Sequence, residues 1–182
     1  RITRYLVHIF STIVILLLFG FVILLSENGA IHYGDHPSRI NWENDGPYIF
    51  FQNDSTLGIQ YIKGNQDDGF HVLTNQISSD SAFTTSCYFN LDDSQFDLVV
   101  DKSQIKIPPS TYTDDGQIFA VSDIESGFNT FRNLLINNKI VDSNLNWSFG
   151  NGHLVLVGDF VDRGFSTTQV LWFIYKLEQE AQ

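Results

Sequence analysis

The stretch Gly152-His-Leu-Val-Leu-Val-Gly-Asp-Phe-Val-Asp-Arg-Gly164 decides the fold of this chain. Its four apolar residues, Leu154 to Val157, predict a buried parallel strand. Gly158 then frees the backbone, so that Asp159 projects from the carboxyl end of the strand. Ligands of open α/β sheets bind outside that edge. The stretch therefore predicts a metal and phosphate site at the end of a strand.

The pattern Gly-Asp-x-x-Asp-Arg-Gly at residues 158–164 resembles the second signature of the calcineurin-like metallophosphoesterases, and its ending is most similar to the phosphoprotein phosphatase branch. The resemblance implies that Asp159 bridges two metal ions, that Asp162 orients a catalytic histidine, and that Arg163 binds the substrate phosphate. The residue types suit these roles, because a carboxylate can hold two cations and arginine donates two parallel hydrogen bonds to phosphate. The alternative is a tight turn with a local ion pair between Asp162 and Arg163.

The segment 117–125 stands where the resemblance places the first family signature, Asp-x-His. Ile118 to Val121 predict the strand, and the resemblance implies that Asp123 and Glu125 are further metal ligands. Glu125 departs from the family histidine, and its anionic oxygen favours Mn²⁺ or Mg²⁺ over Zn²⁺. The expected cofactors are two divalent metal ions, which are Mn²⁺, Mg²⁺, Fe or Zn²⁺. The change predicts either a modified working site or an inactive one. In a purely structural alternative, Asp123 caps the following helix.

Two helical patterns accompany these strands. Apolar residues recur at three-to-four spacing between about 127 and 138, and a capping box at Ser166 to Gln169 opens a second helix that runs to the end. The order predicts a βαβα start of an α/β metallophosphoesterase domain, with parallel strands that bring Asp123 and Asp159 to one sheet edge.

The part from 115 to 182 corresponds to the opening of the family domain only. The third family signature, Gly-Asn-His-Glu, is not found in the sequence, and the chain contains no methionine. We therefore expect an N-terminal fragment of a longer protein that is inactive by itself, so that function is inferred for the parent protein.

Residues 5–25 are almost continuously apolar and predict a transmembrane helix, because about 20 helical residues span a bilayer core of about 30 Å. Arg1 and Arg4 precede this segment, whereas Glu27 and Asp35 follow it. The positive-inside rule then places the N-terminus in the cytoplasm and the catalytic portion outside. A cleavable signal peptide is the competing interpretation.

Residues 45–109 predict a small all-β module that resembles a sandwich, because short apolar runs alternate with turn clusters. A linker around Pro108 and Pro109 follows it. Cys87 is interpreted as a buried thiol in one of the strands. The predicted strands are 48–51, 57–62, 70–73, 83–89, 96–100 and 105–107.

The net charge of −11 argues against nucleic acid as a partner. The function that these features favour is a membrane-anchored, metal-dependent phosphoesterase that hydrolyses phosphomonoesters, in a phosphorylated protein or a small molecule, by two-metal activation of water. Two alternatives stay open. One is a phosphodiesterase or nucleotide hydrolase, and the other is a noncatalytic surface-binding module with a degenerate phosphatase fold.

Overall fold

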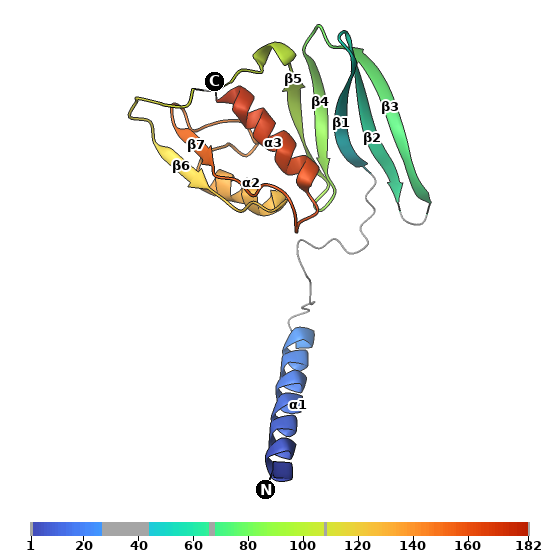
Figure 1. Ribbon diagram of the computed structural model, residues 1–182, viewed down its shortest axis with the longest axis vertical. Coiled ribbons are helices and arrows are strands. Elements are labelled where there is room, and N and C mark those ends of the chain that lie inside the picture. Colours follow the sequence, from blue (N-terminus) through green and yellow to red (C-terminus); the bar gives the residue numbers. More distant parts are fainter. Residues whose placement is uncertain (1, 27–43, 66–67, 108, 182) are drawn as a thin grey trace. The chain divides into compact units, whose positions relative to one another are not determined.

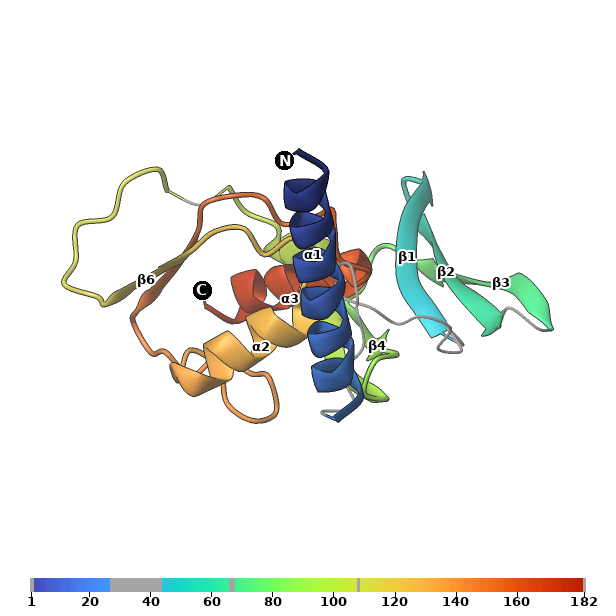
Figure 2. The same cartoon turned by 90° about the horizontal axis from the view of Figure 1, so that it is seen from below.

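The computed structural model describes residues 2–26, 44–65, 68–107 and 109–181. It divides into an N-terminal unit, residues 1–33, and a second unit, residues 34–182. Figures 1 and 2 show the ribbon from two directions at right angles. The first unit contributes one helix, and the second contains all described strands and the other two α-helices.

Helix α1 spans Ile2–Ser26 and carries apolar side chains around its whole circumference. None of its residues is buried, and it is long and apolar enough to cross a membrane. A transmembrane helix or a signal sequence explains an apolar surface of this kind, because a helix that is hydrophobic all round needs an apolar environment. Arg1, Glu27 and Asp35, on which the predicted orientation rests, lie outside the described residues.

Two antiparallel sheets follow. The first has the order β1-β2-β3, and the second pairs β4 with β5. The predicted strand at 105–107 was wrong, because a 3₁₀ turn, Lys102–Gln104, capped by the Asp101 side chain, redirects the chain there. That residues 45–109 form an independent module stays a prediction. The strands are β1 Asn44–Asn53, β2 Thr56–Asn65, β3 Gly69–Ser78, β4 Phe83–Phe89 and β5 Ser94–Val100.

The predicted βαβα order is present in the second half of the chain. Strand β6, Ile118–Val121, pairs in parallel with β7, His153–Leu156. Helix α2, Phe128–Asn137, connects them, and α3, Thr167–Glu180, follows. Because the two strands are parallel, the loops after β6 and after β7 leave the sheet at the same edge.

The expectation that residues 154–157 are a fully buried strand was wrong. Leu154 and Leu156 pack against the core, whereas Val155 and Val157 are 43% and 68% exposed. The reason is the position of the helices, since the core residues of α2 and α3 pack on only one face of the β6–β7 pair.

One hydrophobic core joins the β4–β5 sheet to the helices. Figure 1 shows α3 between that sheet and the β6–β7 pair. Phe173 of α3 is fully buried and packs its ring at centroid distances of 5.6 to 5.8 Å against three others. Cys87 of β4 is also fully buried in this core, as predicted, and burial raises the pKa of its thiol. The three rings around Phe173 are those of Phe96, Phe128 and Phe131.

The predicted capping box at Ser166 and the alternative role of Asp123 as a helix cap were both wrong. Ser166 occupies the N-cap position of α3, but its side chain makes no capping hydrogen bond there. Gln169 instead donates from Nε2 to the carbonyl oxygen of Tyr88, which ties α3 to β4. Gly127 is the N-cap of α2, so Asp123 does not cap this helix. Asp123 is therefore left for another role.

Candidate metal and phosphate site

The loops that follow β6 and β7 run side by side beyond the sheet. Backbone hydrogen bonds continue between them after the last paired residues, Val121 and Leu156. Each amide of the first loop in this series donates to a carbonyl of the second, and this fixes the spacing of the two loops. The bonds are Asp123 N to Gly158 O, 3.3 Å, Glu125 N to Asp159 O, 3.0 Å, and Ser126 N to Phe160 O, 2.9 Å.

All five predicted site residues have a left-handed backbone. Their φ values are 56° at Asp123, 50° at Glu125, 54° at Asp159, 84° at Asp162 and 49° at Arg163. This conformation costs a non-glycine residue about 1–2 kcal/mol and persists where surrounding contacts determine it. The hydrogen bonds between the loops supply such contacts. Strain of this kind concentrates at functional sites, so its coincidence with both signatures favours a site here.

The left-handed turns bring three carboxylates together. Asp123, Glu125 and Asp159 each place one oxygen within 4.8 Å of the others. Asp123 and Asp159 are exposed, and Glu125 is half-buried. A set of three anionic oxygens fits a hard divalent cation such as Mg²⁺ or Mn²⁺. The donor set therefore fits the metal that the family resemblance implies.

Arg163 lies beside this carboxylate cluster. Its Nη1 is 2.6 Å from Oε1 of Glu125, and its Nε is 3.9 Å from Oδ1 of Asp162. The closer partner is therefore Glu125, 38 positions away in the sequence, and not the neighbouring Asp162. Sequence reasoning missed this ion pair, because only the fold of the two loops brings the residues together. The guanidinium side chain is 64% exposed, so it can reach an incoming anion.

Gly164 packs closely against the backbone of the first loop. Its amide donates to the carbonyl oxygen of Glu125 at 3.0 Å. A Cβ at this position would lie 2.7 Å from that oxygen and 2.8 Å from backbone atoms of Ser126, which is closer than Cβ contacts allow. The last glycine of the second signature is thus explained by close approach of the first loop. The hydroxyl groups of Ser126 and Thr167, 2.7 Å apart, join the same loop to α3.

No family model matches the chain. Among known proteins, it is 33% identical over 90 residues to Shewanella-like protein phosphatase 1 of Plasmodium berghei (strain Anka). It is 29% identical over 80 residues to Shewanella-like protein phosphatase 2 of Arabidopsis thaliana. These matches cover 46% and 44% of this chain.

Solved structures agree with the sequence matches. The cold-active protein tyrosine phosphatase of a psychrophilic Shewanella species superimposes with a TM-score of 0.60 at 31% identity. A point mutant of a cold-active protein tyrosine phosphatase gives 0.62 at the same identity. Both cover 76% of this chain. The predicted resemblance to the phosphoprotein phosphatase-like metallophosphoesterases is confirmed.

The likeness reaches beyond the predicted phosphatase-like part. Residues 115–182 are less than half of the chain, so a match over 76% must include β-strand residues that precede them. At the same time, the chain spans only 24% and 20% of the two relatives and 39% of the two solved structures. This chain therefore corresponds to only part of a whole phosphatase.

The opposite end of the β6–β7 pair carries a different polar group. Nε2 of His153 is 2.8 Å from Oδ1 of Asp114, and the ring of Tyr112 lies 5.0 Å from that of His153. The hydrogen bonds from His153 and from the Gly116 amide lower the pKa of Asp114. Because His153 begins β7 while Asp159 follows its end, the histidine serves the structure and not the carboxylate cluster.

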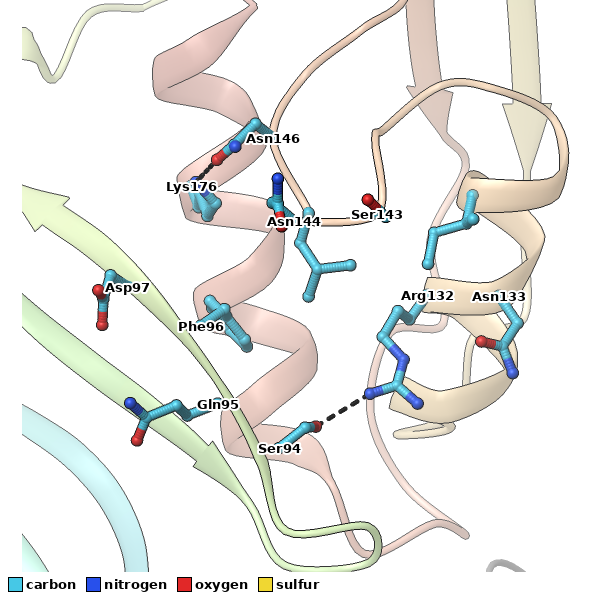
Figure 3. Close-up of a pocket in the computed structure, with 12 residues that line it drawn as sticks. Ser94, Gln95, Phe96, Asp97, Arg132, Asn133, Ser143, Asn144, Asn146 and Lys176 are labelled. Carbon is cyan, nitrogen blue, oxygen red and sulfur yellow. Dashed lines mark hydrogen bonds between the residues drawn. The ribbon is translucent and has the colours of Figure 1, made fainter.

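A polar cleft of about 550 Å³ lies away from the phosphatase-like site, between β5, α2 and α3. Figure 3 shows the Arg132 side chain directed at Ser94, and Lys176 directed at Asn146. Both cations already have carboxylate partners, Asp92 for Arg132 and Glu180 for Lys176. Among the described residues that line the cleft, none belongs to the five predicted site residues. Arg132 and Lys176 therefore stabilise the packing of the segments around the cleft.

Proposed function

We propose that this chain is part of a metal-dependent phosphatase held at a membrane by α1. The observation that carries the proposal is the meeting of both signatures, in which three carboxylates and one arginine from two separate loops occupy one sheet edge. A local turn does not account for this combination, because Arg163 lies closer to Glu125 of the other loop than to Asp162. A helix cap does not account for it either, because Gly127 is the N-cap of α2.

In this proposal, Asp123, Glu125 and Asp159 would hold two divalent metal ions. Bound metal would lower the pKa of a water and stabilise charge on the phosphoryl group. Arg163 binds the phosphate oxygens, since its planar fork matches them and stays charged. Asp162 orients the histidine that the resemblance implies. Its own location beside Arg163 also keeps the arginine near the cluster.

Phosphoproteins are the substrates that we favour. The relatives are named as protein phosphatases, and the similar solved structure is that of a protein tyrosine phosphatase. The exposed position of Arg163 and of two of the carboxylates suits a phosphate that is presented on a large molecule. The N-terminus is proposed to lie in the cytoplasm and the site on the other side of the membrane, with α1 as the anchor.

Hydrolysis by the full-length protein in detergent tests this function. We would measure release of phosphate from p-nitrophenyl phosphate and from a phosphotyrosine peptide, first with chelator and then with Mn²⁺, Mg²⁺ or Zn²⁺ added. We expect turnover that depends on metal. Preference for a diester such as bis-p-nitrophenyl phosphate would favour the phosphodiesterase alternative, and no turnover with any metal would favour the noncatalytic module.

Asp159→Asn is the matching variant. It should reduce metal-dependent hydrolysis at least about 100-fold, the upper end of the effect of removing even an outer-shell partner of a metal. Asp80→Asn removes the same charge from the exposed loop between β3 and β4 and should leave turnover unchanged. Equal activity of the two variants would refute the proposed role of Asp159.

A further inference from the structure

The Glu125–Arg163 ion pair gives one carboxylate two competing partners. We propose that Glu125 holds Arg163 when the cluster lacks a cation and releases it when Glu125 ligates one, so that phosphate binding at Arg163 depends on the metal. This inference rests on the proposed function, because it assigns Arg163 to phosphate and Glu125 to metal. It concerns a residue at which this chain departs from the family pattern.

The backbone fixes Glu125 between the two partners. Its amide donates to the carbonyl oxygen of Asp159, and its carbonyl accepts from Gly164, the residue after Arg163. The left-handed φ of both Glu125 and Arg163 then sets the directions in which their side chains leave the loops. With these main-chain atoms held on both sides, the Glu125 carboxylate lies close to Arg163 and to the carboxylates of Asp123 and Asp159 at the same time.

The negative charge around Arg163 explains why the ion pair with Glu125 hinders phosphate binding. The guanidinium has Glu125 at 2.6 Å and Asp162 at 3.9 Å, so its single positive charge faces two carboxylates. A phosphate that approaches Arg163 meets this negative charge and must also compete for the donor that Glu125 occupies. The Glu125 side chain is only 25% exposed, so solvent screens the pair less than it screens an open surface pair. Phosphate binding should therefore be weak while the pair is intact.

A cation changes this balance. Two other carboxylates, from Asp123 and Asp159, lie within 4.8 Å of the ligand oxygen of Glu125. A cation held by all three would neutralise part of the carboxylate charge that Arg163 faces, which would weaken the ion pair and lower the repulsion of an anion. By thermodynamic reciprocity, if a bound cation strengthens phosphate binding at Arg163, bound phosphate must strengthen cation binding by the same factor. A histidine at this position, as in the family pattern, would have no carboxylate with which to hold the arginine.

The test measures inorganic phosphate binding to the full-length protein in detergent, by isothermal titration calorimetry in the presence of chelator. Without metal, Glu125→Gln should bind phosphate about three- to fivefold more tightly than the wild-type protein, the range that an exposed to half-buried ion pair supports. Asp159→Asn is the matched control, because it removes the same charge from the same cluster without touching Arg163. Its affinity should change less than twofold.

The contrary outcomes are distinct. Equal gains in Glu125→Gln and Asp159→Asn would show a general effect of charge and overturn the proposal, as would unchanged or weaker binding in Glu125→Gln. Glu125→His is a second variant that also removes the pair and should bind phosphate as Glu125→Gln does. Circular dichroism verifies that each variant is folded.

A double-mutant cycle gives an independent readout of the competition. Arg163→Gln should tighten Mn²⁺ binding in the wild-type background, because Glu125 loses its competitor, but should change it much less in the Glu125→Gln background. A similar gain in both backgrounds would mean that Arg163 acts only through its charge and would overturn the proposal. Neither measurement requires turnover, so a protein without phosphatase activity would refute the proposed function while the coupling could still be observed.

Discussion

The aromatic core and the two site loops differ in burial and in backbone conformation. Phe128 and Phe173 are fully buried, lie on regular helices, and pack edge to face at 5.6 Å. Asp123 and Asp159 are exposed, lie outside regular elements, and have strained backbones. Burial of apolar area in the core stabilises the fold, whereas the strained backbone and the neighbouring like charges of the loops destabilise it. Stability and chemistry should therefore respond to different substitutions.

The largest effect on stability is expected in the core. Phe173→Ala removes the ring that contacts Phe96, Phe128 and Phe131, and should lower the free energy of unfolding by about 3–5 kcal/mol. Chemical denaturation of the full-length protein measures it. Leu171→Ala on the exposed face of the same helix, where the side chain is 46% exposed, is the control and should cost about 1 kcal/mol or less. Similar costs would contradict the assignment of the core.

A smaller effect on stability, coupled to one on the site, is expected at Gly164. In Gly164→Ala, the added Cβ would lie 2.7 Å from the carbonyl oxygen of Glu125, and relieving this overlap should cost about 1–3 kcal/mol. The same displacement should weaken Mn²⁺ binding, measured by calorimetry. Gly20→Ala has no neighbour within 4 Å of the added Cβ and should change neither quantity in the second unit. Full Mn²⁺ affinity in Gly164→Ala would contradict the tight junction of the two loops.

Relief of backbone strain should produce a gain. Asp162 has φ of 84°, so Asp162→Gly should raise the free energy of unfolding by about 0.5–1 kcal/mol, the left-handed penalty less the greater freedom of glycine in the unfolded chain. Hydrolysis should fall at the same time, because the carboxylate is lost. A variant that is less stable than the wild-type protein would show that contacts of Asp162 outweigh its strain. Asp80→Gly, in an exposed loop, serves as the control.

The smallest effect concerns pH. Burial alone would raise the pKa of Asp92, but hydrogen bonds from Arg132 and Ser94, with the charge of Arg132, lower it overall. A carboxyl group whose pKa is lower in the folded state stabilises the fold above its unfolded pKa, about 3.9, and loses that contribution as the pH falls through the folded value. Asp92→Asn should thus cost less than about 1 kcal/mol at pH 7, since the side chain is 40% exposed, and the difference should vanish in acid. A difference that grows below pH 4 would have the wrong sign.

The sequence allowed the parallel strands and the two helices to be predicted, because the spacing of apolar residues is a local signal. The roles of the five site residues stay predictions. Glycine at 158 and two apolar runs were enough to place Asp159 after a strand. The ion pair between Glu125 and Arg163 could not be predicted, since it depends on the register between loops 38 positions apart. The exposure of Val155 was missed for a similar reason, because apolar residues do not reveal which face of a strand is covered. The left-handed backbone conformation of the acidic site residues was missed, because positive φ values are uncommon outside glycine.

Binding of Mn²⁺ to the full-length protein tests most directly whether the carboxylate cluster is a metal site. Electron paramagnetic resonance reports free Mn²⁺ without requiring turnover. We predict that the wild-type protein removes Mn²⁺ from solution and that Asp159→Asn does so at least about 10-fold more weakly, while Asp80→Asn behaves like the wild-type protein. Equal Mn²⁺ binding by the wild-type protein and Asp159→Asn would contradict the account, because the ion would then be held elsewhere.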